Sequence, residues 1–266
     1  MDVTQIESKI TKKTKAILVV HIYGFPTDMD RVIEIANKYN LFIIEDSAEM
    51  HGQKYKDKIC GSFGLISILS FYPNKHITTG EGGMILTDNE EIATKCAYYR
   101  NLCFMPKKRF VHEEIGWNYR MTNLQAALGV AQLEKIENHI KRKREIGALY
   151  NSYLKDVDQI ELMPLKTEFS ENIYWVYAIV LKDNFPHNAE WIMVKLAELG
   201  VGTRPFFYPM HLQPVFLKKG WYKNEKYPIA EKISERGFYI PSGLGLKNEE
   251  ITLVAENLIK VLNDNS

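Results

Sequence analysis

Two short apolar segments separated by an amphipathic one make the clearest pattern near the start of the chain. Residues 16–20 and residues 41–44 are continuous apolar runs, and residues 29–39 between them carry apolar side chains at helical spacing. Asp28 precedes the amphipathic segment and can cap a helix there. Continuous apolar runs of this length are typical of strands in a parallel sheet that is covered on both faces. The pattern therefore predicts a βαβ unit with parallel strands.

The rest of the chain predicts further elements in two regions. In the first region we expect strands over residues 66–71 and 84–87, and helices over residues 90–101 and 123–153. The second region predicts a strand, a helix, a short extended segment and two more helices, over residues 175–181, 189–199, 201–204, 229–236 and 249–263. We therefore predict an α/β protein in two domains. A large domain with a mostly parallel sheet would span residues 1–140, and a smaller C-terminal domain, α/β or α+β, would span residues 141–266.

The composition excludes several classes of protein. The 266 residues carry 34 Lys+Arg against 33 Asp+Glu, so no overall field draws the chain to nucleic acid or to an anionic membrane. Three widely spaced cysteines indicate neither a disulfide framework nor a metal site. The first residues are polar, unlike a signal peptide, and no stretch approaches the roughly 18 apolar residues of a membrane span. We expect a cytoplasmic protein that binds no metal, nucleic acid or membrane and holds any anionic ligand locally.

Two charged residues follow strand ends, where parallel sheets bind their ligands. Asp46 follows the second apolar strand, and Lys75 follows the strand over residues 66–71, close to a glycine-rich stretch. A lysine amine can condense with an aldehyde, and a carboxylate can keep a pyridine nitrogen protonated. Pyridoxal phosphate requires both. The same spacing equally fits a turn aspartate and a solvated lysine, so spacing alone does not decide between them.

Six motifs along the chain resemble, in order, the signatures of one enzyme family. They are His21-Ile-Tyr-Gly-Phe-Pro26, Glu45-Asp-Ser-Ala-Glu-Met-His-Gly52, Ser70-Phe-Tyr-Pro-Asn-Lys75, Thr78-Thr-Gly-Glu-Gly-Gly83, Gly116-Trp-Asn-Tyr-Arg-Met-Thr-Asn-Leu-Gln-Ala-Ala127 and Pro209-Met-His-Leu-Gln-Pro214. On these motifs nearly the whole chain resembles the DegT/DnrJ/EryC1/StrS sugar aminotransferases. The resemblance implies a type I PLP-dependent aminotransferase fold with pyridoxal 5'-phosphate as cofactor. It also implies transfer of an amino group from glutamate to a nucleotide-linked 4-keto-6-deoxy sugar, for surface polysaccharide or glycan biosynthesis.

Five residues match the family's cofactor site. The resemblance implies that Lys75 forms the Schiff base with the cofactor and afterwards moves the proton between the amino carbon and the ring. It implies that Asp46 pairs with the pyridinium nitrogen and that Glu49 lies near the ring hydroxyl, where a relative can have Gln. Ser70 would hydrogen-bond the cofactor phosphate, and Ala48 would pack against one face of the ring.

Other matching positions imply an active site shared between two subunits. Asn118 would reach the phosphate bound by the neighbouring subunit, with Arg120 close by, so that a homodimer forms both sites. Tyr208 and His211 would meet the sugar nucleotide. An aromatic segment that is simply packed fits these last two residues equally well.

Several alternatives stay open. A PLP-dependent sugar dehydratase of the same family would have histidine in place of the Schiff-base lysine, whereas this chain has Lys75. A truncated, non-catalytic paralogue would keep the fold and lose activity. The nucleotide could also be UDP or dTDP, and the aminated carbon could be carbon 3. The resemblance begins after the family's opening portion, so we expect roughly a hundred residues of a full-length relative, a domain's worth, to have no counterpart here. A protein that truly began at Met1 would expose apolar sheet edges and dissolve poorly.

Overall fold

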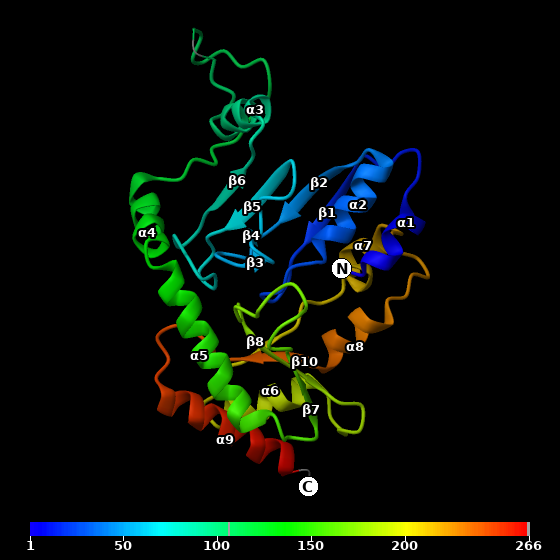
Figure 1. The fold of residues 1–266 in the computed structure, drawn as a ribbon, viewed down its shortest axis with the longest axis vertical. Coiled ribbons are helices and arrows are strands. Elements are labelled where there is room, and N and C mark those ends of the chain that lie inside the picture. Colours follow the sequence, from blue (N-terminus) through cyan, green and yellow to red (C-terminus); the bar gives the residue numbers. More distant parts are fainter. Residues whose placement is uncertain (106, 265–266) are drawn as a thin grey trace. The chain divides into compact units, whose positions relative to one another are not determined.

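A computed structural model describes residues 1–105 and 107–264 of the chain. The chain forms two compact units (Figure 1). Unit 1 consists of Met1–Ile140 together with Lys166–Trp175, and unit 2 consists of Lys141–Leu165 together with Val176–Ser266. The sequence did not indicate that the segment Lys166–Trp175 returns to unit 1.

Unit 1 is built on a four-stranded mixed sheet in the order β1-β2-β5-β6 (Figure 1). The strands are β1 (Ala16–Val20), β2 (Phe42–Asp46), β5 (Ile66–Ser70) and β6 (Gly83–Leu86). β1, β2 and β5 run parallel, and β6 is antiparallel to β5. The predicted βαβ unit is thereby confirmed, and the carboxyl ends of β2 and β5 lie next to each other at one edge of the sheet.

Helix α2 (Met29–Tyr39) makes the crossover between β1 and β2. The Asp28 carboxylate accepts a hydrogen bond from the Arg31 amide at its start, and Asn40 ends it in the left-handed conformation with φ of 52°. The helix and the sheet share one core, whose buried members include Ile17, Val19, Met29, Val32, Ile35, Ala36 and Ile43. Burial of the Val, Ile and Met side chains among them stabilises a fold by ~1.5 to 3 kcal/mol each.

The opposite face of the sheet differs from the prediction that both faces are covered. Leu18 is 56% exposed, Phe42 is 60% exposed and Ile85, which the strand register places on the same face, is 50% exposed. In strands, successive side chains point to opposite faces, so a run that is apolar throughout leaves apolar groups on any face without a covering layer. Among the described residues, α2 packs against one face of the sheet, the face that forms the core given above.

The remaining elements of unit 1 are short, apart from three helices. They are η1 (Val3–Gln5), α1 (Ile6–Lys9), β3 (Lys54–Tyr55), β4 (Lys58–Ile59), α3 (Glu90–Arg100), α4 (Asn123–Leu133) and the start of α5 (Ile136–Leu154). The single helix predicted over residues 123–153 is thus two helices, with a break at Glu134 and Lys135. A capping box between Thr122 and Gln125 starts α4. The apolar spacing continues across the break, which is why the sequence pattern did not reveal it.

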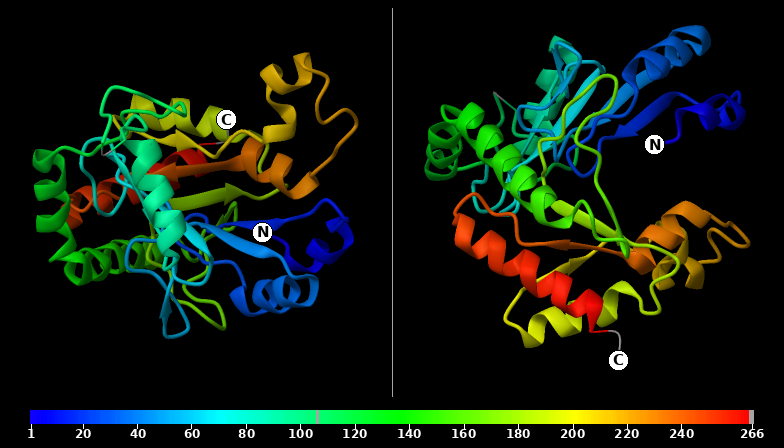
Figure 2. Two further views of the ribbon diagram at one scale, coloured as in Figure 1. Left: turned by 90° about the horizontal axis from the view of Figure 1, so that it is seen from above. Right: turned by 60° about the horizontal axis from the view of Figure 1, so that its bottom comes forward.

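Unit 2 has an antiparallel four-stranded sheet in the order β7-β8-β10-β9, which is the α+β arrangement left open above. Its elements are β7 (Ile160–Leu162), β8 (Tyr177–Leu181), α6 (Ala189–Glu198), β9 (Arg204–Pro205), η2 (Met210–Leu212), α7 (Pro214–Lys218), α8 (Pro228–Arg236), β10 (Gly237–Ile240) and α9 (Asn248–Asn263). Helices α6 and α9 pack against each other (Figure 2). Within the part of the chain that the structure describes, no helix has both the length and the apolar character needed to cross a membrane.

Candidate active site

The Lys75 amine lies in a largely buried position after the end of β5. Its side chain is only 10% exposed, and Nζ lies 3.6 Å from the Glu49 Oε1 atom. Nζ also lies 4.3 Å from the centre of the Trp175 ring, over its face. Burial lowers the pKa of Lys75 below its usual value, while the negative charges of Glu49 and Asp46 oppose that change. A lysine held in this way gives up its proton more readily than a solvated one.

Glu49 faces Lys75 with one carboxylate oxygen and is fixed by the other. Its Oε2 atom accepts a hydrogen bond of 2.7 Å from the Tyr23 amide. Burial raises the pKa of Glu49 to about 7, against the opposing effects of the Tyr23 hydrogen bond and the Lys75 charge. The carboxyl group can therefore change its protonation state near neutral pH, directly beside the lysine amine.

Asp46 is the last residue of β2, in the middle of the sheet. Its Oδ1 atom accepts a hydrogen bond of 3.1 Å from the Ala48 amide, which fixes the turn that follows the strand. Asp46 acts electrostatically on the pKa of both Lys75 and Glu49. The structure therefore brings Asp46, Glu49 and Lys75 into one group at the carboxyl edge of the sheet.

Glu45, next to Asp46, points to the other face of the strand and holds the edge together. Its carboxylate lies 3.2 Å from the His21 Nε2 atom and accepts hydrogen bonds from the amides of Gly61, Phe63 and Gly64. His21 Nδ1 accepts from the Thr27 amide, so the ring proton lies on Nε2 and is donated to Glu45. Burial tends to raise the pKa of Glu45, but these hydrogen bonds hold it below the usual value.

Ser70 ends β5, the strand next to Asp46. Its hydroxyl oxygen accepts a hydrogen bond of 3.3 Å from the Tyr72 amide, in the loop that leads to Lys75. A hydroxyl group in this arrangement keeps its own proton for donation to an anion. Ser70 and Asp46 are thus presented at the same edge of the sheet by two neighbouring parallel strands.

His51 is buried behind this edge. Its ring stacks on Phe71 with centres 5.6 Å apart, and in the described residues neither ring nitrogen has a hydrogen-bond partner. Burial, together with the charge of Lys75, lowers the pKa of His51 to about 4. The imidazole is therefore neutral at physiological pH, and it serves here as a packed ring next to the lysine.

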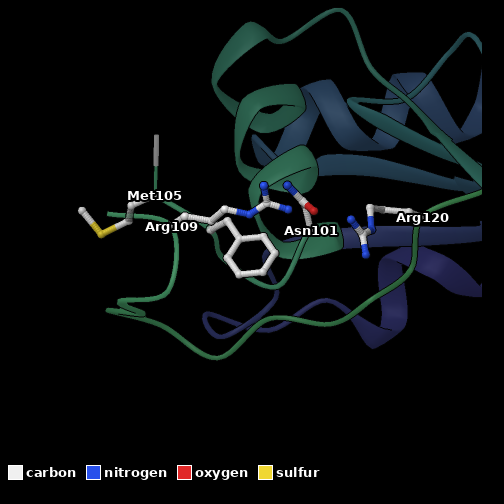
Figure 3. Close-up of a pocket in the computed structure, with 5 residues that line it drawn as sticks. Asn101, Met105, Arg109 and Arg120 are labelled. Carbon is white, nitrogen blue, oxygen red and sulfur yellow. The ribbon is translucent and has the colours of Figure 1, made fainter. Parts of the chain in front are cut away.

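Asn118 and Arg120 lie on the exposed segment before α4. Arg120 Nε donates a hydrogen bond of 2.9 Å to the Asn118 side-chain oxygen. Arg120 also lines a pocket, together with Asn101, Phe104, Met105 and Arg109 (Figure 3). Within the described residues, no hydrogen bond joins Asn118 to Lys75 or Asp46, so the structure of one chain does not bring Asn118 into the lysine site.

Tyr208 and His211 belong to unit 2 and differ in exposure. Tyr208 is 55% exposed, whereas His211 is 5% exposed. The His211 Nε2 atom lies 2.8 Å from the Glu231 carboxylate, and the ring packs edge-on against Tyr227. His211 therefore links η2 to α8, and Tyr208 presents its ring to solvent.

The sequence analysis missed Tyr23 and Trp175. Their rings stack with centres 5.7 Å apart, and Trp175 Nε1 donates a hydrogen bond of 3.0 Å to the carbonyl of Asn74, the residue before Lys75. Tyr23 lies in a motif that carried the family resemblance, and its place after a strand end was an available signal. Trp175 lies a hundred residues beyond Lys75, where no local pattern indicates the contact.

The chemistry of the lysine site fits pyridoxal phosphate. An amine, a carboxylate at the neighbouring strand end and a hydroxyl suited to an anion gather at one edge, in Lys75, Asp46 and Ser70. Each of the three groups that the cofactor needs, at its aldehyde, its ring nitrogen and its phosphate, has a residue of the appropriate kind.

Comparisons with known proteins agree with this chemistry. The sequence pattern of the DegT/DnrJ/EryC1/StrS aminotransferase family matches residues 1–259. GDP-perosamine synthase of Escherichia coli O157:H7 is 40% identical over 264 residues, covering 99% of this chain and 70% of the relative. GDP-perosamine synthase of Caulobacter vibrioides is 36% identical over 262 residues, covering 98% of this chain and 70% of the relative. The solved structure of Helicobacter pylori PseC, an aminotransferase involved in the biosynthesis of pseudoaminic acid, matches with a TM-score of 0.91 and 26% identity, covering 98% of this chain and 70% of that one.

Proposed function

Because the chain belongs to the DegT/DnrJ/EryC1/StrS family and is a PLP-dependent sugar aminotransferase with the type I fold, we propose that it aminates carbon 4 of a GDP-linked 4-keto-6-deoxy sugar. The amino donor is glutamate, and the product serves surface polysaccharide or glycan biosynthesis. Two relatives that the chain matches almost from end to end are GDP-perosamine synthases, which supports this choice of nucleotide and carbon.

The observation that carries the proposal is the largely buried Lys75 amine, which lies 3.6 Å from the Glu49 carboxylate and is under the electrostatic influence of Asp46. When bound, pyridoxal phosphate draws electrons away from the carbon that carries the amino group. Lys75 would hold the cofactor through Nζ, and its amine would serve to move a proton at the amino carbon. The lowered pKa of Lys75 supports both roles, since only the neutral amine can attack a carbonyl or accept a proton.

The residues around the lysine orient the cofactor. Asp46 would keep the ring nitrogen protonated through a charge-assisted hydrogen bond, and Ser70 would donate its hydroxyl proton to the phosphate. Ala48, in the turn fixed by Asp46, would pack on one face of the ring. Glu49 would face the ring hydroxyl, where its raised pKa of about 7 would allow it to share a proton.

We further propose that the enzyme is a homodimer in which Asn118, with Arg120, contacts the phosphate held by the partner subunit. The exposed position of Asn118, which has no bond to its own lysine site among the described residues, supports this arrangement. Tyr208, exposed on unit 2, is proposed to contact the sugar nucleotide. His211 is proposed to support that contact from its buried position on Glu231.

A substrate assay tests the reaction. The full-length protein, supplied with GDP-4-keto-6-deoxymannose, glutamate and pyridoxal phosphate, should give a GDP-linked 4-amino sugar and 2-oxoglutarate, both identified by mass spectrometry. UDP- and dTDP-linked 4-keto sugars serve as matched controls and should react much more slowly. A 3-deoxygenated product would point to the dehydratase alternative, which Lys75 opposes, and absence of any product with cofactor bound would point to a non-catalytic paralogue.

Subunit complementation tests the shared site. A Lys75→Ala subunit co-expressed with an Asn118→Ala subunit gives mixed dimers in which one site carries both changes and the other carries neither. Activity should therefore reappear in the mixture, although each variant alone is inactive or weak. Verified mixed dimers without activity would mean that Asn118 serves its own chain.

A further inference from the structure

Trp175 reaches unit 1 on a segment that is tied down by several hydrogen bonds. The Gln53 side-chain amide donates to the carbonyl oxygens of Gly24, at 2.5 Å, and Glu171, at 2.9 Å. The Asn172 side-chain oxygen accepts from the Tyr174 amide at 2.6 Å. These contacts join the segment to the loop after β1, so that Trp175, which is 3% exposed, has a fixed position.

From this position Trp175 contacts the lysine segment at two points. Its indole N–H donates to the Asn74 carbonyl at 3.0 Å, which fixes the backbone directly before Lys75. Its ring face lies 4.3 Å from Lys75 Nζ, a distance at which the ring attracts an ammonium group. The Trp175 side chain therefore restrains both the backbone before Lys75 and the amine at the tip of the Lys75 side chain.

Tyr23 links Trp175 to Glu49, the other residue that contacts the Lys75 amine. Its amide holds Glu49 Oε2 at 2.7 Å, and its ring stacks on Trp175. Tyr23 adopts a left-handed φ of 54°, which is uncommon for a residue with a side chain. That conformation presents its amide and its ring to two groups that both contact Lys75.

We propose that Trp175 is a positioning residue for Lys75: its N–H holds the Asn74 carbonyl and its ring face holds the amine against Glu49. Trp175 thereby keeps the Lys75 amine in one orientation during both halves of the reaction. This inference rests on the proposed role of Lys75 as the cofactor-binding lysine. It assigns a role to a residue of the segment Lys166–Trp175, for which the family motifs found in the sequence give none.

Two substitutions separate the two contacts. Trp175→Phe keeps an aromatic face and removes the N–H donor, whereas Trp175→Leu removes both and keeps an apolar side chain. We expect kcat to fall several-fold in the first and about a hundredfold in the second, with KM changed far less, because substrate contacts remain. Trp221→Phe and Trp221→Leu, at an indole that is 51% exposed in unit 2, are the matched controls and should leave kcat unchanged.

A measurement without cofactor distinguishes positioning from general loosening of the site. In the cofactor-free full-length protein, the acetylation of Lys75 by acetic anhydride is followed by peptide mass spectrometry as a function of pH. Loss of the ring face beside an apolar leucine should destabilise the ammonium, so the labelling midpoint should move to lower pH by about 0.5. Loosening would admit water and move the midpoint to higher pH. We therefore expect Trp175→Leu to combine a Lys75 amine that is acetylated at lower pH with a lower kcat.

The outcomes are decisive in each case. The inference is overturned if the pH midpoint of Lys75 acetylation in Trp175→Leu is unchanged or higher than in the wild type. If the leucine variant does not fold, an unchanged kcat in Trp175→Phe overturns it instead. Borohydride reduction of the wild-type holoenzyme, followed by peptide mapping, keeps this result separate from the proposed function. Cofactor trapped on a lysine other than Lys75 would contradict the proposed function. Cofactor trapped on Lys75, together with Trp175 variants that keep the wild-type kcat and labelling midpoint, would contradict the positioning role alone.

Discussion

Each unit of this protein contains a lysine that is largely or fully buried, and the two lysines have different neighbours. Lys75 in unit 1 lies beside the Glu49 carboxylate and under the influence of Asp46, against the face of Trp175. Lys143 in unit 2 is 4% exposed and donates to the Ser242 carbonyl at 2.7 Å and to the Ser242 hydroxyl at 3.2 Å. Burial lowers the pKa of both, that of Lys143 to about 7.

The contrast teaches that burial and a lowered pKa do not by themselves mark a catalytic lysine. The Ser242 atoms that hold Lys143 do not titrate, and they tie α5 to the segment after β10 inside one unit. Lys75 instead lies among groups that can exchange protons or change charge, at the edge of a sheet where ligands bind. The predictions below test whether the neighbours, rather than burial, separate the two lysines.

Removal of the Lys75 amine should have the largest effect. We expect Lys75→Ala to lower kcat by at least about 10⁴-fold, because the proposed mechanism uses the Lys75 amine both to bind the cofactor covalently and to move the proton. Circular dichroism should show an unchanged fold. A variant that still yields a borohydride-reducible cofactor adduct would contradict the assignment.

Loss of the neighbouring charge should come next. Asp46→Asn should still bind cofactor, as followed by visible absorbance, but kcat should fall by roughly 10²- to 10³-fold, since a neutral amide cannot keep the ring nitrogen protonated. Asp28→Asn serves as the control, because that carboxylate caps α2 and an amide oxygen can cap equally well. Equal kcat values for Asp46→Asn and wild type would show that Asp46 is not the partner of the ring nitrogen.

The contrast between the lysines also shows how far sequence reasoning extends. We predicted Asp46, Ser70 and Lys75 as site residues because family motifs place them at or after the ends of predicted strands, and the parallel sheet brings the ends of β2 and β5 together. The family, the fold and the cofactor were predicted correctly in this way.

Contacts made over long stretches of chain could not be predicted from local patterns. Trp175 meets a loop a hundred residues earlier, and its segment crosses back from the region assigned to the second domain. The structure also buries Lys143, which stands in the basic stretch of residues 141–144. Neither hydrophobic period nor residue type encodes such burial, which depends on tertiary packing.

Glu49→Gln should have a smaller effect that depends on pH. The amide resembles the protonated carboxyl group, which predominates in the wild type below the pKa of about 7. At pH 6 the variant and the wild type should therefore behave alike, and at pH 8 kcat/KM of the variant should be several-fold lower, because Lys75 lacks the ionised carboxylate of Glu49 beside it. The same pH dependence in both proteins would mean that ionised Glu49 plays no part.

The stability of the Glu49 variant gives an independent check with a defined sign. Because the folded protein raises the pKa of Glu49 from 4.5 to about 7, it holds this proton more tightly than the unfolded chain does. The resulting stabilisation is complete below about pH 4.5 and is lost as the pH rises through 7. Urea unfolding should show the wild type losing stability relative to Glu49→Gln between pH 5 and pH 8.

Lys143→Met should have the smallest effect on activity, within about twofold, because we expect its hydrogen bonds to Ser242 to contribute to stability rather than to catalysis. Stability should change instead. Methionine fills a similar volume but leaves the Ser242 carbonyl and hydroxyl without their donor, at a cost of ~1 to 3 kcal/mol for a buried polar group. Lys141→Met, at an exposed position two residues earlier, is the matched control and should leave both properties unchanged.

The stability difference should also depend on pH. Folding lowers the pKa of Lys143 from 10.5 to about 7, so between these values the unfolded chain binds more protons than the folded protein. The free energy of unfolding of the wild type therefore rises with pH in this window, and the methionine variant lacks that contribution. Urea unfolding at pH 6.5 and at pH 9 should show a wild-type advantage that is larger at pH 9. An advantage that is equal at both values, or a large loss of kcat in a folded variant, would remove the distinction between the two lysines.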